Sequence, residues 1–187
     1  MNIAILSADL FSKRNTTQER YKPMFKKIGV TTLLFLTLSG QAFAADKAIT
    51  STQATSLAQN AVSIGLKQGY NVAVTVVDAN GVILATVRAD QALPHTPKTS
   101  FKKAFTAFAA KENTSDLIAT IHKGDPTYMN KFVLSTLSNG QDNIIFLRGG
   151  VLIKHNDAIV GAIGVGGAPG GQLDDNIAFE ALKGFSL

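Results

Sequence analysis

Three histidines, His95, His122 and His155, are the strongest candidates for holding a metal ion in this chain, which contains no cysteine. Imidazole is a common ligand of iron and zinc. The spacing of the three matches neither an HExxH motif nor a pair four residues apart, so the sequence does not indicate a structural metal cage. His95 is favoured because Pro94 and Pro97 bracket it in a stiff loop, which can hold one imidazole at little ordering cost.

Each histidine also has a simpler explanation. His122 falls near the predicted end of a helix, beside Lys123 and Gly124, where it favourably meets the negative end of the helix dipole. His155 falls at a predicted turn and is expected to be solvated. His95 has the alternative role of a loop residue that hydrogen-bonds backbone groups. We therefore expect that, if a metal is held, His95 is its ligand.

The run from Arg148 to Asp175 carries eight glycines around a strand pattern with little side-chain bulk, and we expect it to form one wall of a binding site. Glycine permits positive φ angles and close approach by another group. The run lacks the Gly-Lys-Ser/Thr of a phosphate loop and no parallel β-α-β repeat follows it, which disfavours nucleotide binding. Close backbone packing, or an anion at the N-terminus of the last helix, is favoured instead.

Other polar side chains along the chain have ordinary structural explanations. Lys102 and Lys103 are expected on the solvent face of a helix, and helix-dipole pairing explains Asp174 and Asp175 at the start of the last helix. The hydroxyl of Thr106 has no evident base beside it, and the chain has no G-x-S-x-G motif. A Ser-His-Asp hydrolase is therefore poorly supported.

Five segments have strand character. Residues 71–90 contain two β-branched runs separated by residues 78–81, and the Asn-Gly pair between them is a strong hairpin signal. Further strands are predicted at 143–148, 151–155 and 158–166, joined by turns short enough for antiparallel neighbours. The sequence therefore predicts one antiparallel sheet of about five strands.

Helical periodicity marks the segments around these strands. We predict a first helix over 54–67, which Gly69 stops, and a second that is capped by Thr99 or Ser100 and runs to residue 109. A short helix from Thr114 or Ser115, a turn or short helix over 125–134 and a polar loop over 135–142 are predicted to follow. Asp174 and Asp175 are predicted to open the last helix. The fold class is α+β, with a single antiparallel sheet flanked by helices.

Residues 1–44 are expected to be a secretory signal peptide, possibly with an over-long N-terminus. Lys26 and Lys27 precede an apolar run over 28–38, and small residues follow at 42–44, as at a cleavage site. The run is too short to span a bilayer. A single domain would then occupy 45–187, in the periplasm or outside the cell.

The basic charge of the chain lies largely in that leader. It holds six of the 18 basic residues and two of the 13 acidic ones, which leaves a net charge of about +1 on residues 45–187. No basic stripe remains to attract nucleic acid. We expect no nucleic-acid partner, and no membrane partner after the leader is removed.

Several motifs together resemble the GlcG/HbpS-like haem-binding family. They are PHT at 94–96, KKAFTA at 102–107, and GGVLI followed by VGAIGVGGAPGG and an acidic pair, and the similarity covers about residues 48–185. The family pattern reads GG-x-P-I and GAIGVSG, whereas Leu152 and Gly166 stand at its proline and serine positions here. The resemblance implies a profilin-like or sensor-like fold, a homo-oligomer, and a protein that sequesters or degrades haem or another tetrapyrrole.

The same resemblance implies a set of site residues. His95 approaches the iron, phenylalanines of the 101–108 helix contact the macrocycle, and Lys102 or Lys103 meets a propionate. The expected cofactor-binding residues are His95, Thr96, Lys102, Lys103, Phe105, Thr106, Gly149, Gly150, Gly166, Gly167, Gly170 and Gly171, with His95 as the metal ligand. No catalytic residue is assigned, and whether the protein is an enzyme stays open.

Two alternatives to haem binding stay open as well. In the first, the protein binds or converts small organic acids, and the loop over 166–171 and Lys102 hold a carboxylate without any metal. In the second, it is an oligomeric interaction or regulatory module. The small residues Ala104, Ala107, Gly161 and Gly164 would then allow close packing between subunits.

Overall fold

One antiparallel sheet organises the part of the chain that the computed structural model describes, residues 48–124, 126 and 132–187. The predicted leader and most of the 125–134 segment lie outside the described residues. The sheet has the order β2-β1-β4-β3. Its strands are β1 (Ala73–Asp78), β2 (Ile83–Arg88), β3 (Gly150–His155) and β4 (Ala158–Gly166). The predicted α+β class, with one antiparallel sheet flanked by helices, is confirmed.

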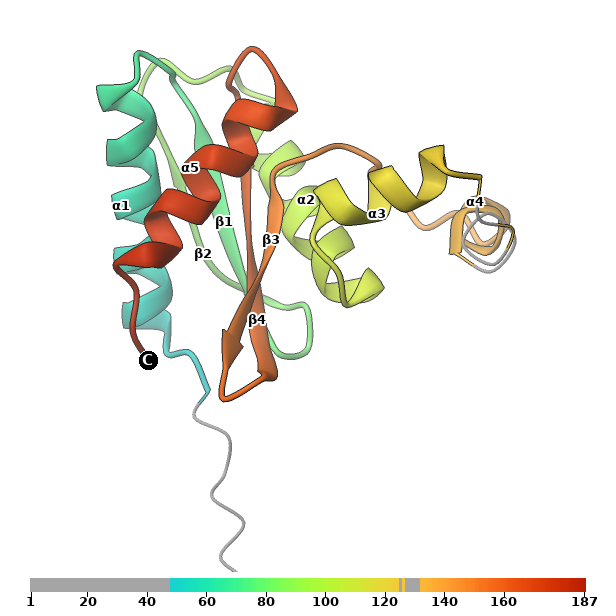
Figure 1. The fold of residues 1–187 in the computed structure, drawn as a ribbon. Coiled ribbons are helices and arrows are strands. Elements are labelled where there is room, and N and C mark those ends of the chain that lie inside the picture. The colour runs from blue at the N-terminus through green and yellow to red at the C-terminus, as the bar shows by residue number, and fades with distance from the viewer. Residues whose placement is uncertain (1–47, 125, 127–131) are drawn as a thin grey trace, which may run out of the picture. The chain divides into compact units, whose positions relative to one another are not determined.

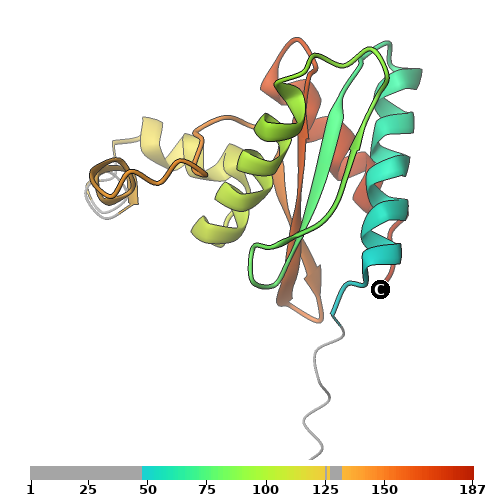
Figure 2. The ribbon, with the colours of Figure 1, turned by 180° about the vertical axis from the view of Figure 1, so that it is seen from behind.

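Helices cover both faces of this sheet (Figures 1 and 2). Helices α1 (Ser51–Lys67) and α5 (Gly171–Lys183) pack on one face, and α2 (Thr96–Ala110) packs on the other. The larger apolar core lies between α1, α5 and the sheet, and a smaller one lies under α2. Helices α3 (Thr114–His122) and α4 (Ser135–Ser138) follow on the α2 side. Within the described residues, no helix is long and apolar enough to cross a membrane.

Both predicted hairpins form, each with its expected turn residues. Between β1 and β2, Asp78 Oδ1 accepts the N–H groups of Asn80 at 2.8 Å and Val82 at 2.9 Å. Gly81 has φ +77°, which glycine adopts without steric cost. Between β3 and β4, Asn156 and Asp157 both have positive φ, as a two-residue type I′ turn requires. Local turn chemistry therefore fixes the register of both strand pairs.

The first helix begins and ends on local signals. The side chain of Thr50 accepts the N–H of Gln53, and the side chain of Gln53 accepts the N–H of Thr50, which completes a capping box. Gly69 follows the helix with φ +84°, so the predicted stop is correct. Burial of Leu57, Ala58 and Ala61 on one face holds α1 against the sheet.

The fifth predicted strand, over 143–148, is wrong. This apolar segment runs beside α2 without pairing to a strand, and the N–H of Ile145 donates to the Thr106 hydroxyl at 2.9 Å. A side chain thus satisfies a backbone group that a strand would have paired. The predicted polar loop over 135–142 also differs, because it begins with the short helix α4.

Three helices begin earlier than predicted. Helix α1 begins at Ser51 and not at residue 54, and the other two are α2 and α5. Helix α2 begins at Thr96, with Pro97 in its first turn, where a missing N–H costs nothing. His95 is therefore the N-cap residue, and neither Thr99 nor Ser100 caps this helix. Helix α5 begins at Gly171 after Gly170, three residues before Asp174. The shifts of α2 and α5 bring helix N-termini close to residues expected in the site.

Glycines let α2 lie in backbone contact with the sheet. A Cβ atom at Gly164 would stand 2.0 Å from the carbonyl oxygen of Ser100, and one at Gly150 would stand 2.1 Å from that of Lys103. Ala104, which is fully buried, faces Gly164 across the same contact. Ala104, Ala107, Gly161 and Gly164 therefore pack within one chain. The expectation that these small residues pack between subunits is wrong.

We predict that Gly164→Ala destabilises the fold by about 3 kcal/mol, because the added methyl forces α2 away from β4. Gly184→Ala is the matched control, since nothing lies within 4 Å of its Cβ position. This control should change stability by less than about 0.5 kcal/mol. Urea denaturation measures both variants, and equal midpoints would contradict the backbone contact.

Candidate functional site

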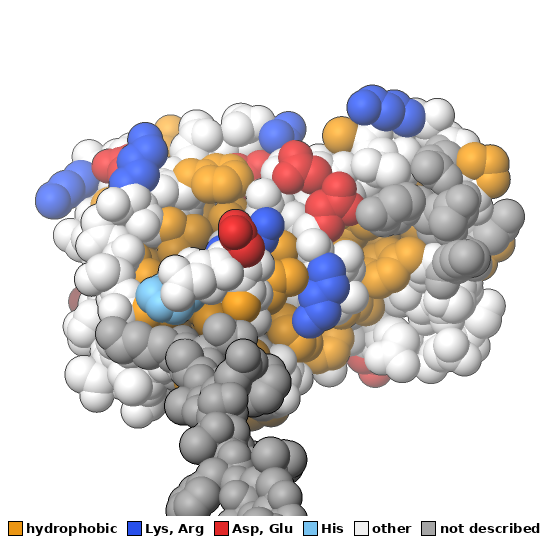
Figure 3. Space-filling view, turned by 60° about the horizontal axis from the view of Figure 1, so that its bottom comes forward, with side chains coloured by type: hydrophobic (Ala, Val, Ile, Leu, Met, Phe, Trp, Pro, Cys, Tyr) orange, Lys and Arg blue, Asp and Glu red, His pale blue; other side chains and the backbone are white. Residues whose placement is uncertain are grey.

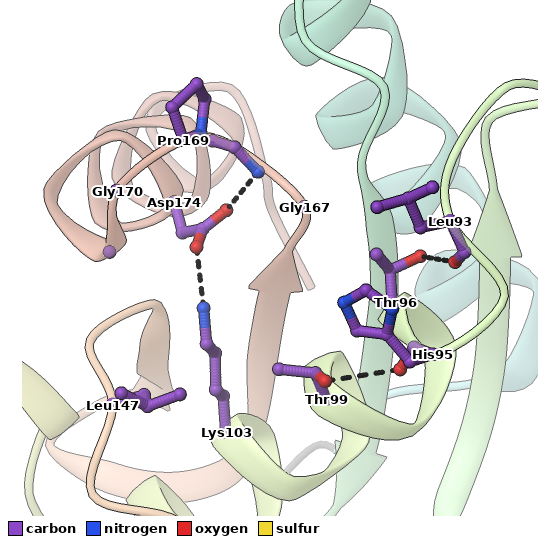
Figure 4. Close-up of a pocket in the computed structure, with 12 residues that line it drawn as sticks. Leu93, His95, Thr96, Thr99, Lys103, Leu147, Gly167, Pro169, Gly170 and Asp174 are labelled. Carbon is purple, nitrogen blue, oxygen red and sulfur yellow. Dashed lines mark hydrogen bonds and ion pairs between the residues drawn. The ribbon is translucent and has the colours of Figure 1, made fainter.

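A cavity of about 320 Å³ opens where the N-terminal ends of α2 and α5 meet (Figure 4). This volume lies at the lower end of the range for small-molecule sites, about 300–1,000 Å³. Its wall combines apolar and polar groups from both helices and from three loops. The lining residues are Leu93, His95, Thr96, Thr99, Lys103, Leu147, Gly167, Ala168, Pro169, Gly170, Gly171 and Asp174.

A buried ion pair lies in the cavity wall. The ammonium of Lys103 on α2 lies 2.6 Å from Asp174 Oδ2 on α5, and each side chain is only 4% exposed. Asp174 Oδ1 also accepts the N–H of Ala168 at 3.1 Å. Lys103 is thus not on the solvent face of its helix, and Asp174 does more than complement a helix dipole. The expectation for Lys103 is therefore wrong, and the helix-dipole explanation of Asp174, which does lie in the first turn of α5, is incomplete.

Burial raises the pKa of the Asp174 carboxyl above its ordinary value, and Lys103 and the Ala168 N–H oppose this shift without cancelling it. Asp175 adds to the rise because it is a second carboxylate nearby. The folded protein therefore holds this proton more tightly than the unfolded chain does. Asp174 accordingly lowers the free energy of unfolding as the pH rises from the ordinary aspartate pKa to the raised one.

A second acidic contact holds the loop that precedes β3. Asp175, 1% exposed, accepts the N–H of Gly149 at 2.6 Å and the Nε–H of Arg148 at 2.8 Å. Gly149 has φ +115°, and a Cβ atom there would lie 2.7 Å from the carbonyl oxygen of Val165. Gly149 is therefore required for this turn. Gly149 does not line the cavity, but it packs against Lys103 and Asp174, which do.

His95 stands at the cavity as the N-cap of α2. Its side chain is exposed and makes no capping hydrogen bond, while its carbonyl accepts the N–H of Thr99 at 3.1 Å and the Thr99 hydroxyl at 3.2 Å. The fixed backbone therefore presents an imidazole whose ring is not used in capping. The alternative role, capping of backbone groups by this side chain, is not what the structure has.

The structure brings together half of the expected cofactor-binding residues. Those that line the cavity are His95, Thr96, Lys103, Gly167, Gly170 and Gly171. The others do not line it, and they are Lys102, Phe105, Thr106, Gly149, Gly150 and Gly166. Among these, Thr106 is buried, and its hydroxyl accepts the backbone N–H of Ile145. Gly150 packs against α2.

Phe105 also lies away from the cavity. It contacts Phe101, with ring centroids 5.8 Å apart, and it approaches Gly81 in the β1–β2 turn. The apolar part of the cavity wall instead comes from Leu93, Leu147 and Pro169, none of which was expected. Leu93 and Leu147 are large and exposed, which is a signal that only a structure reveals.

The described residues contain no group of three or more His, Cys, Asp or Glu side chains that could hold a metal ion. His122 is exposed at the end of α3, and His155 is half-buried at the end of β3. Neither lines the cavity. A metal at this cavity would therefore have a single protein imidazole, which suits an iron already held by a macrocycle.

Comparison with known proteins identifies the family to which this chain belongs. Residues 49–183 match the family model described as haem degrading protein HbpS-like. A Citrobacter freundii protein, described as an uncharacterized 15.0 kDa protein in the dhaT-dhaS intergenic region, is 30% identical over 138 residues. That alignment covers 74% of this chain and 92% of the relative.

Two solved structures are similar over most of the described residues. One is a double mutant of HbpS from Streptomyces reticuli, with a TM-score of 0.65 and 30% identity over 87% of this chain and 99% of that one. The other is described as a complex of PduOC with heme, with a TM-score of 0.63 and 26% identity over 73% and 94% of the two chains.

We predict that Lys103→Met destabilises the protein by about 3–5 kcal/mol, because it leaves the buried Asp174 carboxylate without its counter-charge. The loss should be largest at neutral pH and smaller in acid, where Asp174 is protonated. Adding Asp174→Asn should recover most of the stability. Lys102→Met, outside the cavity, is the control, and chemical denaturation at two pH values measures all four proteins.

Proposed function

Because the chain belongs to the HbpS-like haem-degrading-protein family, we propose that it binds haem or a related tetrapyrrole in the cavity beside His95. One observation carries the proposal: an exposed imidazole, with no capping role, stands at a cavity whose wall is partly apolar and partly cationic. A similar protein has been solved as a complex with heme. Haem would supply the iron, and this chain would supply the His95 imidazole as an iron ligand and the surrounding wall.

Each part of the wall suits one part of such a cofactor. Leu93, Leu147 and Pro169 offer apolar surface to a macrocycle. His95 offers an iron ligand from the N-terminus of α2. Because α2 is fixed by backbone contact with β4, the position of His95 is set by the fold and does not depend on a mobile loop.

We propose that the protein binds the cofactor and thereby sequesters it. The description of the family also names haem degradation. Degradation can be tested with a haem-loaded sample, because the Soret band would decay with time if the macrocycle were broken. Binding of small organic acids is the second candidate. It is favoured by the cationic group inside the cavity and by a volume of about 320 Å³, which suits a small ligand.

We also propose that the protein is exported and forms a homo-oligomer. The oligomer is supported by large apolar side chains that remain exposed on the single chain, among them Leu137, Val82 and Leu147. Figure 3 views one face on which hydrophobic side chains reach the surface in several places between charged ones. The export proposal rests on the leader pattern of residues 24–44.

For the cofactor, we predict that the mature protein gives a saturable Soret band on titration with hemin. His95→Ala should shift this band and weaken binding by about 1–3 kcal/mol or more, through loss of a ligand or hydrogen-bonding partner. His122→Ala and His155→Ala are matched controls that should bind as the wild type does. A wild-type spectrum retained in His95→Ala would exclude His95 as the iron ligand.

For export and assembly, we predict two results. The secreted protein should begin at Ala45. In solution, its mass should be greater than that of one chain. Intact-mass measurement of secreted material gives the first residue, and light scattering at micromolar concentration gives the assembly. A species that retains residues 26–43 would contradict the leader, and the mass of a single 45–187 chain would contradict the oligomer.

A further inference from the structure

The sequence contains two Asn-Gly pairs, Asn80-Gly81 and Asn139-Gly140. Because glycine has no Cβ atom, its backbone nitrogen can approach the side chain of a preceding asparagine without steric hindrance. That approach starts the spontaneous deamidation of asparagine. We propose that Asn139 is a deamidation site in the folded protein, whereas the β1–β2 hairpin protects Asn80 from the same reaction.

The reaction needs only water as a second reactant. The backbone nitrogen of Gly140 forms a bond to the side-chain carbonyl carbon of Asn139, and the bond between that carbon and the amide nitrogen breaks. The amide leaves as ammonia, which also takes the proton that the glycine nitrogen loses. Water then opens the cyclic imide at either carbonyl and leaves aspartate or isoaspartate, so that a carboxylate replaces a neutral amide.

The β1–β2 turn holds both residues of the first pair. Asn80 is exposed, but its N–H donates to Asp78 Oδ1 at 2.8 Å and its side-chain amide donates to Asp78 Oδ2 at 3.5 Å. The N–H of Gly81 donates to the Asp78 carbonyl at 3.1 Å. Gly81 is buried, and a Cβ atom there would lie 3.0 Å from the ring of Phe108 and 3.2 Å from that of Phe105. The attacking nitrogen is therefore hydrogen-bonded and shielded by two aromatic rings.

The second pair stands at the open end of a short helix. Asn139 is the C-cap residue of α4, which has only four residues. Both Asn139 and Gly140 are exposed, and nothing lies within 4 Å of the Cβ position of Gly140. In the part of the chain that the structure describes, no hydrogen bond holds the Asn139 side chain. The N–H of Gly140 donates to the Leu137 carbonyl at 3.3 Å, beyond the usual range of about 2.7–3.2 Å.

The two pairs thus differ in what must break before the glycine nitrogen can attack. At Asn139 only the last turn of α4 must open, and helix ends open at little cost. At Asn80 the turn must release the Asp78 contacts and the ring packing, while β1 and β2 stay paired on either side. Because the reaction proceeds from the opened form, its rate follows the free energy of local opening.

The product changes the charge beside a second cavity. A cavity of about 420 Å³ is lined by Gly140 together with Thr136, Leu137 and Asp142. A carboxylate at position 139 would stand at the C-terminal end of α4, where the helix dipole is already negative. Deamidation should therefore weaken the hold of α4 on this cavity wall.

Peptide mapping by mass spectrometry tests the inference on the mature protein, stored at neutral pH and sampled over time. Asn139 should deamidate at least about tenfold faster than Asn80, which corresponds to a difference of about 1.4 kcal/mol in opening free energy. In denaturant the two sites should react at similar rates, because glycine follows both. Asp78→Ala, which removes the turn contacts of Asn80, should speed the reaction at Asn80 and leave Asn139 unchanged.

Equal rates in the folded protein, or a faster reaction at Asn80, would overturn the inference. A ratio that persists in denaturant would also overturn it, since the difference would then come from neighbouring residues and not from the fold. Asn139→Gln is the control for assignment and should remove the faster product. If Asp78→Ala does not fold by circular dichroism, the wild-type comparison of folded and denatured chains decides alone. None of these results depends on the ligand of the cavity beside His95.

Discussion

The ion pair between Lys103 and Asp174 is the interaction on which the candidate site depends. The two residues come from helices on opposite faces of the sheet, and they meet beyond its end, where β4 finishes at Gly166. Desolvating both charges is costly, so such a pair persists only where further hydrogen bonds satisfy it. Asp174 has one from Ala168, in the loop that the cavity shares. The pair thereby joins the middle of α2 to the first turn of α5 beside the cavity.

Glycine determines how near the helices come. Gly150 and Gly164 bring α2 into backbone contact with β3 and β4, which sets the depth of Lys103, while Gly170 leaves the start of α5 uncovered. The same residue type thus serves packing at the first two positions and access at the third. A glycine-rich run in a sequence therefore does not separate a tight helix contact from an open cavity wall.

Features set by neighbouring residues could be predicted from the sequence, and those set by distant residues could not. The Asn-Gly hairpin and the stop at Gly69 follow from local backbone preferences. The false strand over 143–148 has the right composition, but its partner is the hydroxyl of Thr106, 39 positions earlier. The sequence likewise indicates only a helix-dipole role for Asp174, because its partner Lys103 is 71 positions away. Two local signals mark helix starts that the sequence prediction misses: Pro97 in the first turn of α2 and the capping box of Thr50 and Gln53 at the start of α1.

We propose that the cavity between the starts of α2 and α5 is the ligand site, with His95 at its edge. Anomalous diffraction at the iron edge, from crystals of the mature protein grown with hemin, would locate the iron. We expect an iron peak within coordination distance of the His95 imidazole and ligand density in the cavity. An iron peak at His122 or His155, with no ligand density in the cavity, would contradict it.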